Sequence, residues 1–263
     1  MDPPVLQLLR RKLINGNHIL HHHGILDAYG HLSVRHPFDP DIFIMSRNIA
    51  PGLLSSPDDL IEYSVSTGQP LASSSPEGFV ERHIHSEIYA RHPDVHSVAH
   101  SHAEAVLPYT IAVDVPLRAC THMAGFLGAK PVPVYDVAAH TETEGGGDLL
   151  VREGTLAREL ARHFDDGCVV ALMRGHGFTA VAEKVELAVL RAIYTQKNAV
   201  VQTTAMTLCA AVNPTVGDPG RGIKFLSEEE AVAAANMTRW SANRPWRLWL
   251  REVEESGLYV NQG

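Results

Sequence analysis

Hydrophobic residues change their spacing along the chain, and these changes predict helices that alternate with short strands. From Leu6 to Leu20 they recur at a helical period, which predicts a helix over residues 6–23 that ends at Gly24. The same criterion predicts further helices, over 78–91, from about 103, over 155–164 and over 183–211. Short runs of apolar and β-branched residues predict strands, over 32–35, 42–45, 61–65, 95–100, 132–134 and 168–173. Such an alternation is typical of a layered α/β domain.

The C-terminal part of the chain reads differently. Residues 213–222 are rich in proline and glycine and predict a linker. Beyond them, Ser227 and Glu230 have the spacing of a capping box, which predicts the start of a final helix. Three tryptophans, Trp240, Trp246 and Trp249, recur at near-helical spacing. This pattern indicates packing, a subunit contact or a lid over the site of a neighbouring subunit. We therefore expect one domain over 1–213 and a C-terminal helical arm over 214–263.

Composition narrows the class of protein. Of the 263 residues, 45% are hydrophobic and the formal net charge is −8, so nucleic acid is not expected as the principal partner. The sequence has no run of about 18 apolar residues and no signal-peptide pattern at its start, so no membrane span is expected. Its three cysteines are widely spaced, which suits free thiols in a reducing compartment. These features predict a cytoplasmic protein.

The most specific chemical signal is a pair of histidines at the end of a predicted strand. Residues i and i+2 of a strand point to the same face, so His100 and His102 present two imidazoles side by side. A third imidazole, that of His176, lies in a loop flanked by glycines. Three nitrogen ligands leave coordination positions open for a substrate, as a catalytic metal requires. We expect one divalent metal ion, zinc, manganese or iron.

Histidine pairs of this pattern are not rare here, because the chain holds 16 histidines. His21 with His23, and His83 with His85, have the same spacing. Both pairs fall on predicted helices, where residues i and i+2 diverge by about 200° and cannot chelate one ion. A structural alternative stays open for His100 and His102, in which the two imidazoles only form hydrogen bonds at the end of a strand.

Four motifs follow one another along the chain: Glu81 with His85, His92-Pro93-Asp94-Val95, His100-Ser101-His102 and Gly175-His176-Gly177. In their order and spacing, the stretch from about residue 6 to 210 resembles the class II aldolase/adducin family. The resemblance implies a three-layer α/β/α sandwich around a mixed, mainly antiparallel sheet. It also implies a homotetramer with sites between subunits.

The resemblance assigns roles to individual residues. In that family the histidine pair and the downstream histidine bind a divalent metal ion, which implies His100, His102 and His176 as ligands. A glutamate 19 residues before the first ligand is the acid/base, which implies Glu81. The tyrosine that acts as an acid in the sugar aldolases falls near His122, which implies a catalytic role for this histidine.

Three segments depart from those that bind phosphate in the sugar-phosphate aldolases: Gly30-His31, Ser46-Arg47-Asn48 and Phe79-Val80. Phe79 and Val80 replace two hydroxyl donors with apolar bulk. Arg47 offers a planar fork suited to a carboxylate, and we expect it to bind substrate together with Ser46 and His31. These changes resemble the branch of the family that decarboxylates hydroxylated aromatic dicarboxylates.

The resulting expectation is a metal-dependent lyase, a non-oxidative decarboxylase of a hydroxylated aromatic (di)carboxylate. The metal would stabilise the enolate-like charge that forms as the carbon–carbon bond breaks, and no organic cofactor is expected. Two alternatives stay open: an aldolase acting on a non-phosphorylated carbonyl substrate, and a non-haem iron oxygenase on the same scaffold. A non-enzymatic module like adducin is disfavoured because the three histidines and Glu81 are all present.

Overall fold

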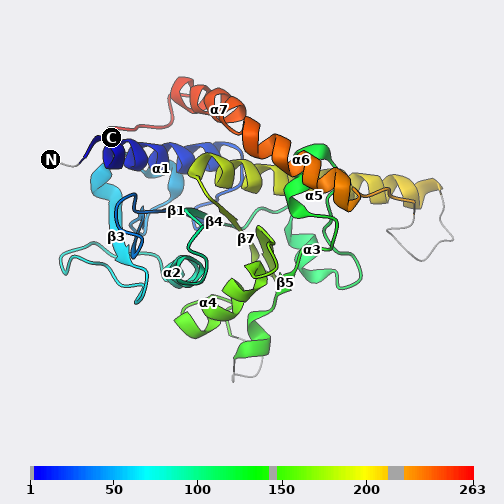
Figure 1. The fold of residues 1–263 in the computed structure, drawn as a ribbon, viewed down its shortest axis with the longest axis horizontal. Helices are drawn as coiled ribbons and strands as arrows, with labels where there is room; N and C mark the ends of the chain where they lie inside the picture. The colour runs from blue at the N-terminus through cyan, green and yellow to red at the C-terminus, as the bar shows by residue number, and fades with distance from the viewer. Residues whose placement is uncertain (1–2, 142–146, 213–221) are drawn as a thin grey trace.

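The computed structural model describes residues 3–141, 147–212 and 222–263, in which a seven-stranded sheet crosses the molecule. The strand order is β3-β2-β1-β4-β7-β6-β5 (Figure 1). Every neighbouring pair is antiparallel except β5 with β6, which is parallel. The strands are β1 (His31–Arg35), β2 (Ile42–Ser46), β3 (Leu60–Ser64), β4 (Ser97–Ser101), β5 (Val134–Tyr135), β6 (Val170–Met173) and β7 (Gly177–Ala182). The expected mixed, mainly antiparallel sheet is confirmed.

Alternate residues of the central strands face opposite sides of this sheet, as the pleat requires. Leu32 and Val34 of β1 and Ala99 of β4 belong to one hydrophobic core. Val98 of β4 belongs to a second core on the other face. Because both faces are covered, all five residues of β1 and of β4 are buried. Polar side chains of these strands are therefore held inside the protein.

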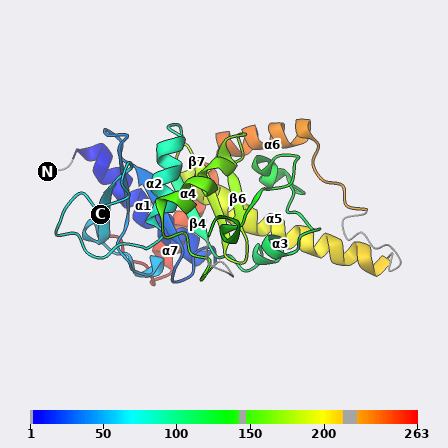
Figure 2. The same ribbon diagram turned by 90° about the horizontal axis from the view of Figure 1, so that it is seen from below.

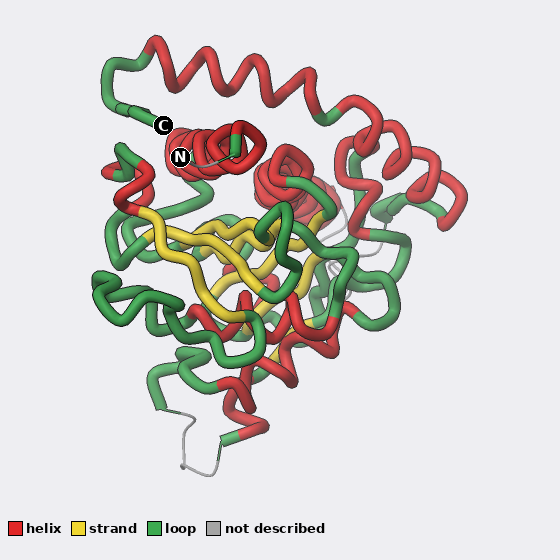
Figure 3. Tube along the Cα trace, turned by 60° about the vertical axis from the view of Figure 1, so that its left-hand side comes forward, coloured by secondary structure: helices red, strands yellow, loops and turns green. Residues whose placement is uncertain are grey.

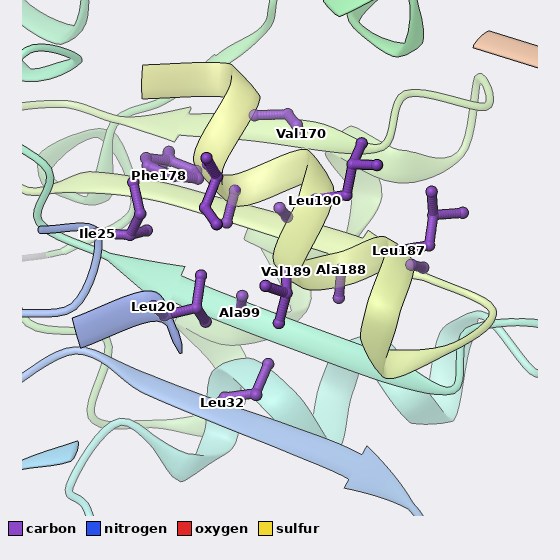
Figure 4. Close-up of a cluster of buried hydrophobic side chains, with 14 of the residues drawn as sticks. Leu20, Ile25, Leu32, Ala99, Val170, Phe178, Leu187, Ala188, Val189 and Leu190 are labelled. Carbon is purple, nitrogen blue, oxygen red and sulfur yellow. The ribbon is translucent and has the colours of Figure 1, made fainter. Parts of the chain in front are cut away.

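Two long helices, α1 (Pro4–His22) and α5 (Val185–Val212), cover the first face of the sheet. Figure 3 shows them nearly end-on above the strands. In the close-up of this core, Leu20 of α1 and Val189 of α5 lie with Ala99 of the sheet between the two helices (Figure 4). Burial of such apolar side chains supplies most of the free energy that holds a layered domain together.

The second face is covered by α2 (Arg82–Arg91) and α4 (Gly154–Ala161), which pack on each other and lie in front of the strands in Figure 2. Ile84 and Ile88 of α2 and Leu160 of α4 fill the core between these helices and the sheet. Helices therefore lie on both sides of the sheet. The expected three-layer α/β/α architecture is confirmed.

The described part of the C-terminal arm, residues 222–263, holds two helices, α6 (Glu228–Ser241) and α7 (Asn243–Glu255), where the sequence predicted one. The predicted capping box of Ser227 is present at the start of α6. The first helix packs on η3 (His122–Leu127), and the second packs on α1 and α5 (Figure 1). Trp246 and Trp249 are buried there, whereas Trp240 is 83% exposed. The predicted linker, except Gly222, lies outside the described residues.

Two further elements differ from the sequence prediction. The helix predicted over 78–91 begins at Arg82, because Gly78 pairs with Arg47 in a β-bridge and Phe79 is buried. Glu81 is therefore the residue that precedes the helix, and is not in its middle. The helix expected from about 103 is reduced to α3 (Leu107–Ile111), one short turn.

The sequence prediction also missed β7, which is a central strand of the sheet. Glycine and alanine make up half of this strand, and both are depleted in strands, so they give little β-strand signal. Within the part of the chain that the structure describes, no helix is long and apolar enough to cross a membrane.

Gly177, the first residue of β7, allows that strand to approach β4 closely. A Cβ atom at Gly177 would lie 2.0 Å from the Ser101 carbonyl oxygen and 3.1 Å from the His102 Cα. Both neighbours are backbone atoms, which cannot move aside cheaply. The absence of a side chain here therefore sets how near His176 can come to His102.

Substituting Gly177→Ala is expected to lower the free energy of unfolding by about 3 kcal/mol or more, since overpacking against backbone forces the strands apart. Denaturant unfolding monitored by circular dichroism measures this loss. Gly167→Ala is the matched control, because Gly167 has φ +79° and no atom within 4 Å of the added Cβ. There we expect a loss of about 1–2 kcal/mol, from backbone conformation alone. Equal losses in the two variants would contradict the steric argument.

Candidate metal centre

Three neighbouring strands bring polar side chains into one row on the α2 face of the sheet. In the pairing of β1 with β4, His31 lies directly opposite His100, and in the pairing of β4 with β7, His100 lies opposite Thr179. Directly paired residues of antiparallel strands have their Cβ atoms about 5 Å apart. The register of the sheet, rather than any local sequence, therefore assembles the row. His102 and His176 lie just beyond the ends of β4 and β6.

Four side chains converge at this point. The Nε2 atom of His102 lies 3.1 Å from Nε2 of His100 and 3.1 Å from Nε2 of His176. The Glu81 Oε2 atom lies 3.5 Å from Nε2 of His176 and 3.7 Å from Nε2 of His100. One ligand atom from each of the four residues lies within 4.8 Å of all the others. Ligands of one zinc ion are separated by about 3–3.5 Å, so this donor set fits a single divalent ion.

The opposite nitrogen of each imidazole is anchored by its own partner. His100 Nδ1 lies 3.2 Å from the Thr179 hydroxyl, and His176 Nδ1 donates to the Leu149 carbonyl at 3.1 Å. Leu149 has φ +64°, an uncommon conformation that directs this carbonyl. His102 Nδ1 lies 3.2 Å from both carboxylate oxygens of Asp27. With Nδ1 held in this way, Nε2 of each ring faces the centre, which is the arrangement found at metal sites.

Burial controls the charge of these groups. It lowers the pKa of His100 well below its ordinary value, and the neighbouring imidazoles add to the effect. His176 differs, because a hydrogen bond and the negative charge of Glu81 outweigh burial and raise its pKa. The second oxygen of Glu81 accepts a hydrogen bond from the Val151 N–H at 2.9 Å. A neutral His100 beside a buried carboxylate is ready to bind a cation without first losing a proton.

His31 lies beside this group but is not part of it. Its ring centroid is 4.9 Å from that of His100 and 4.8 Å from that of Phe79. The fully buried ring of His85 makes a 2.7 Å hydrogen bond to His31. Burial lowers the pKa of His31 well below its ordinary value and lowers that of His85 to about 3.

The remaining predicted site residues do not belong to the group of four side chains that converge. Arg47 follows β2 and binds the Asp59 carboxylate through Nε at 2.9 Å, with 39% of its side chain exposed. Ser46 is buried at the end of β2. His122 is exposed at the start of η3, and none of the described contacts of the four-residue group involves it.

Sequence reasoning missed three groups that anchor the imidazoles: Asp27, Thr179 and the Leu149 carbonyl. Asp27 carries a local signal, because its carboxylate accepts hydrogen bonds from the Tyr29 and Gly30 N–H groups, as aspartate does in turns. That signal predicts a turn and nothing about a metal. Thr179 lies on the missed strand β7, so its position beside His100 could not be found without the sheet order.

Replacing His85 is expected to change how stability depends on pH. The ring is fully buried and its pKa falls to about 3, so the unfolded chain takes up a proton from about pH 6.5 downward while the folded protein does not. The histidine therefore contributes stability above pH 6.5 that is lost as the pH falls towards 3. Its contribution to the slope approaches about 1.4 kcal/mol per pH unit.

Denaturant unfolding of the metal-free protein between about pH 6 and 4.5 tests this slope. In His85→Gln the free energy of unfolding should fall less steeply with decreasing pH than in the wild type. The difference in slope should approach about 1.4 kcal/mol per pH unit, which corresponds to the uptake of one proton. His96→Gln is the control, because His96 is exposed. Parallel slopes in the wild type and in His85→Gln would show that the buried ring does not resist protonation.

Replacing Asp27 is expected to weaken metal binding without unfolding the protein, since 49% of its side chain is exposed. Loss of a carboxylate that orients a ligating histidine costs about 10–100-fold in metal affinity. Competition with a chromophoric zinc chelator measures the change in Asp27→Ala, and Asp27→Asn should lose less because its oxygen still accepts from His102. Asp39→Ala is the control, since Asp39 also caps a turn. An unchanged affinity in Asp27→Ala would remove Asp27 from the site.

Comparison with known proteins agrees with this geometry. Residues 11–203 match the family model for the Class II Aldolase and Adducin N-terminal domain. The chain is 52% identical over 258 residues to the decarboxylase tropJ of Talaromyces stipitatus, covering 95% of this chain and 96% of that protein. It is 32% identical over 187 residues to the 3,4-dihydroxyphthalate decarboxylase of Arthrobacter keyseri, covering 66% and 69% of the two chains.

Solved structures share the fold at low sequence identity. The L-fuculose 1-phosphate aldolase of Glaciozyma antarctica superposes with a TM-score of 0.70 at 18% identity, covering 98% of this chain and 97% of the other. An aldolase II superfamily protein of Pseudomonas syringae superposes with a TM-score of 0.75 at 18% identity, covering 98% and 96%. The family model spans most of the chain, and the chain therefore belongs to the class II aldolase and adducin family.

Proposed function

We propose that this protein is a metal-dependent lyase that releases CO₂ from a hydroxylated aromatic carboxylate. The observation that carries the proposal is the 52% identity, over nearly the whole chain, to a protein named as a decarboxylase. A second relative is named for the decarboxylation of a dihydroxyphthalate, which supports an aromatic acid as substrate. The donor set of three imidazoles and one carboxylate supports a lyase that uses a metal ion.

The residues that would hold the ion are His100, His102 and His176. Their Nε2 atoms face one point and their Nδ1 atoms are already occupied, so each ring has one ligand atom to offer. A bound divalent ion supplies a positive charge that stabilises electron density on the oxygens of the substrate as CO₂ departs. Three imidazoles are compatible with zinc, manganese or iron.

Glu81 is the residue we assign to proton transfer. Its Oε1 atom is held by the Val151 N–H, which fixes the carboxylate and leaves Oε2 directed at the imidazoles. Glu81 is 6% exposed, so a substrate bound there would displace the little water that reaches it. A carboxylate in this position can accept the proton of a ring hydroxyl and return it to the ring carbon.

The walls of the site favour a flat, acidic substrate. Phe79 lies against His31 and offers an apolar surface to an aromatic ring. The Arg47 guanidinium binds Asp59 through Nε, and we assign its other nitrogens, together with the neighbouring Ser46, to a carboxylate of the substrate. His122 is exposed, and we assign it as a second proton donor. A homotetramer is part of the proposal. A cytoplasmic location and the absence of an organic cofactor complete the proposal.

Metal analysis and CO₂ release together test this function. Protein purified without added metal should hold about one divalent ion per chain, and His100→Ala/His102→Ala should lose it. The wild type should release CO₂ from 3,4-dihydroxyphthalate or a related hydroxylated di-acid equally with and without O₂. Glu81→Gln should lower kcat at least about 100-fold while retaining the metal. Glu77→Gln is the matched control, because Glu77 is exposed four residues earlier.

The other outcomes separate the competing functions. Turnover that consumes O₂ and requires iron would identify an oxygenase. Cleavage of a hydroxy-carbonyl compound without release of CO₂ would identify an aldolase. Protein that binds no metal even after reconstitution would overturn the lyase assignment.

A further inference from the structure

A chain of buried hydrogen bonds leads from helix α2 to His31 beside the metal centre. The Tyr89 hydroxyl lies 2.8 Å from the Ser33 Oγ, which lies 2.6 Å from His85 Nδ1. His85 Nε2 in turn lies 2.7 Å from His31 Nδ1. None of these four residues is more than 1% exposed. The chain ends at His31 Nε2, a buried atom that has no hydrogen-bond partner among the described residues.

Regular secondary structure builds this chain. His31 and Ser33 alternate along β1 and so face the same side of the sheet. His85 and Tyr89 are four residues apart on α2, so they lie on one face of the helix, against those strand residues. The Arg35 guanidinium, two residues further along β1, lies over the Tyr89 ring and donates to the Tyr89 carbonyl. We call Tyr89, Ser33, His85 and His31 the relay. Its residues are held by both the strand and the helix.

The direction of the hydrogens along the chain follows from counting donors and acceptors. Each contact in the chain carries one hydrogen, so in each pair one group donates and the other accepts. Burial raises the pKa of Tyr89, so its hydroxyl keeps its hydrogen. The Ser33 Oγ atom lies 2.8 Å from the phenol oxygen, within hydrogen-bond distance. Among the described residues, Ser33 Oγ is then the acceptor for the phenol hydrogen.

If Tyr89 donates to Ser33, Ser33 can donate to His85 Nδ1, and His85 Nε2–H can donate to His31 Nδ1. One group is then left without a partner, the Nε2–H of His31. In the reverse direction the phenol hydrogen and the His31 Nε2 lone pair are both left without partners. An unpaired buried polar group costs about 1–3 kcal/mol, so the first direction is the more stable one.

We propose that Tyr89, Ser33 and His85 are positioning residues that hold His31 as the neutral tautomer with its hydrogen on Nε2, and that this hydrogen is donated to a carboxylate oxygen of the substrate. The second half of the proposal rests on the proposed function. His31 lies opposite His100 in the sheet, next to the candidate metal ligands, so a substrate bound there meets this ring. An acceptor on the ligand then satisfies the one donor that the protein leaves unpaired.

The tautomer can be observed directly in the zinc-loaded full-length protein labelled with ¹⁵N-histidine. A long-range ¹H–¹⁵N spectrum distinguishes the two neutral tautomers, and the signals of His31 are those lost in His31→Gln. We expect the Nε2–H form in the wild type and a shift of this signal when phthalate is added. Ser33→Ala should give a mixture of tautomers and weaken phthalate binding about tenfold. Ser33→Thr, which retains a hydroxyl, should restore both.

Ser97→Ala is the matched control, because the buried Ser97 hydroxyl binds the Ser33 carbonyl and not the relay. It should leave the tautomer and phthalate binding unchanged. An Nδ1–H tautomer in the wild type would overturn the proposal whether or not any variant folds, and so would an unchanged tautomer in Ser33→Ala. An Nε2–H tautomer whose signal does not respond to bound phthalate would overturn the substrate contact. If the tautomer and the phthalate shift are as expected but no di-acid releases CO₂, the relay stands and the proposed function fails.

Discussion

The pairing of β4 with β1 on one side and β7 on the other is the constraint on which the site depends. It places His31, His100 and Thr179 in one row, and it brings the loops that carry His102 and His176 to the same edge. The approach of β7 to β4 is possible because position 177 has no side chain. A slip of one residue in this pairing would turn every imidazole of the row to the opposite face. The candidate metal centre is thus a property of the sheet and not of one motif.

Burial is the second condition, because it sets the protonation of the site before any ligand arrives. An imidazole in water is partly charged near neutral pH, and several charged imidazoles within 5 Å would repel one another and any cation. Enclosure between two layers of helices removes this charge from His100, His31 and His85. Glu81 counteracts the effect at His176. Glu81 is the carboxylate that lies against the imidazoles, within 3.7 Å of both His100 and His176.

Much of this site could be predicted from the sequence, and the reasons for success and failure are physical. His100, His102 and His176 carry strong local signals, a strand pair and a glycine-flanked loop, and the structure brings them together with Glu81. The anchors Thr179 and Asp27 were missed because their roles arise from contacts between segments 75 or more residues apart. The start of α2 was placed too early because Gly78 and Phe79 take part in a β-bridge and a core that no local pattern reveals. Fold class was the easier inference, since layering follows from the alternation of helices and strands.

The shared fold does not by itself choose the reaction. A protein named as a sugar-phosphate aldolase superposes on 98% of this chain, and a protein named as a decarboxylase is 52% identical to it. Both reactions break a carbon–carbon bond and leave charge on an oxygen, so one metal site can serve either. We propose that the choice lies in the residues that meet the rest of the substrate, for which Phe79, Arg47 and His31 are the candidates. A buried imidazole held in one tautomer donates to an acceptor and repels another donor, so it discriminates between substrates by chemistry as well as by shape.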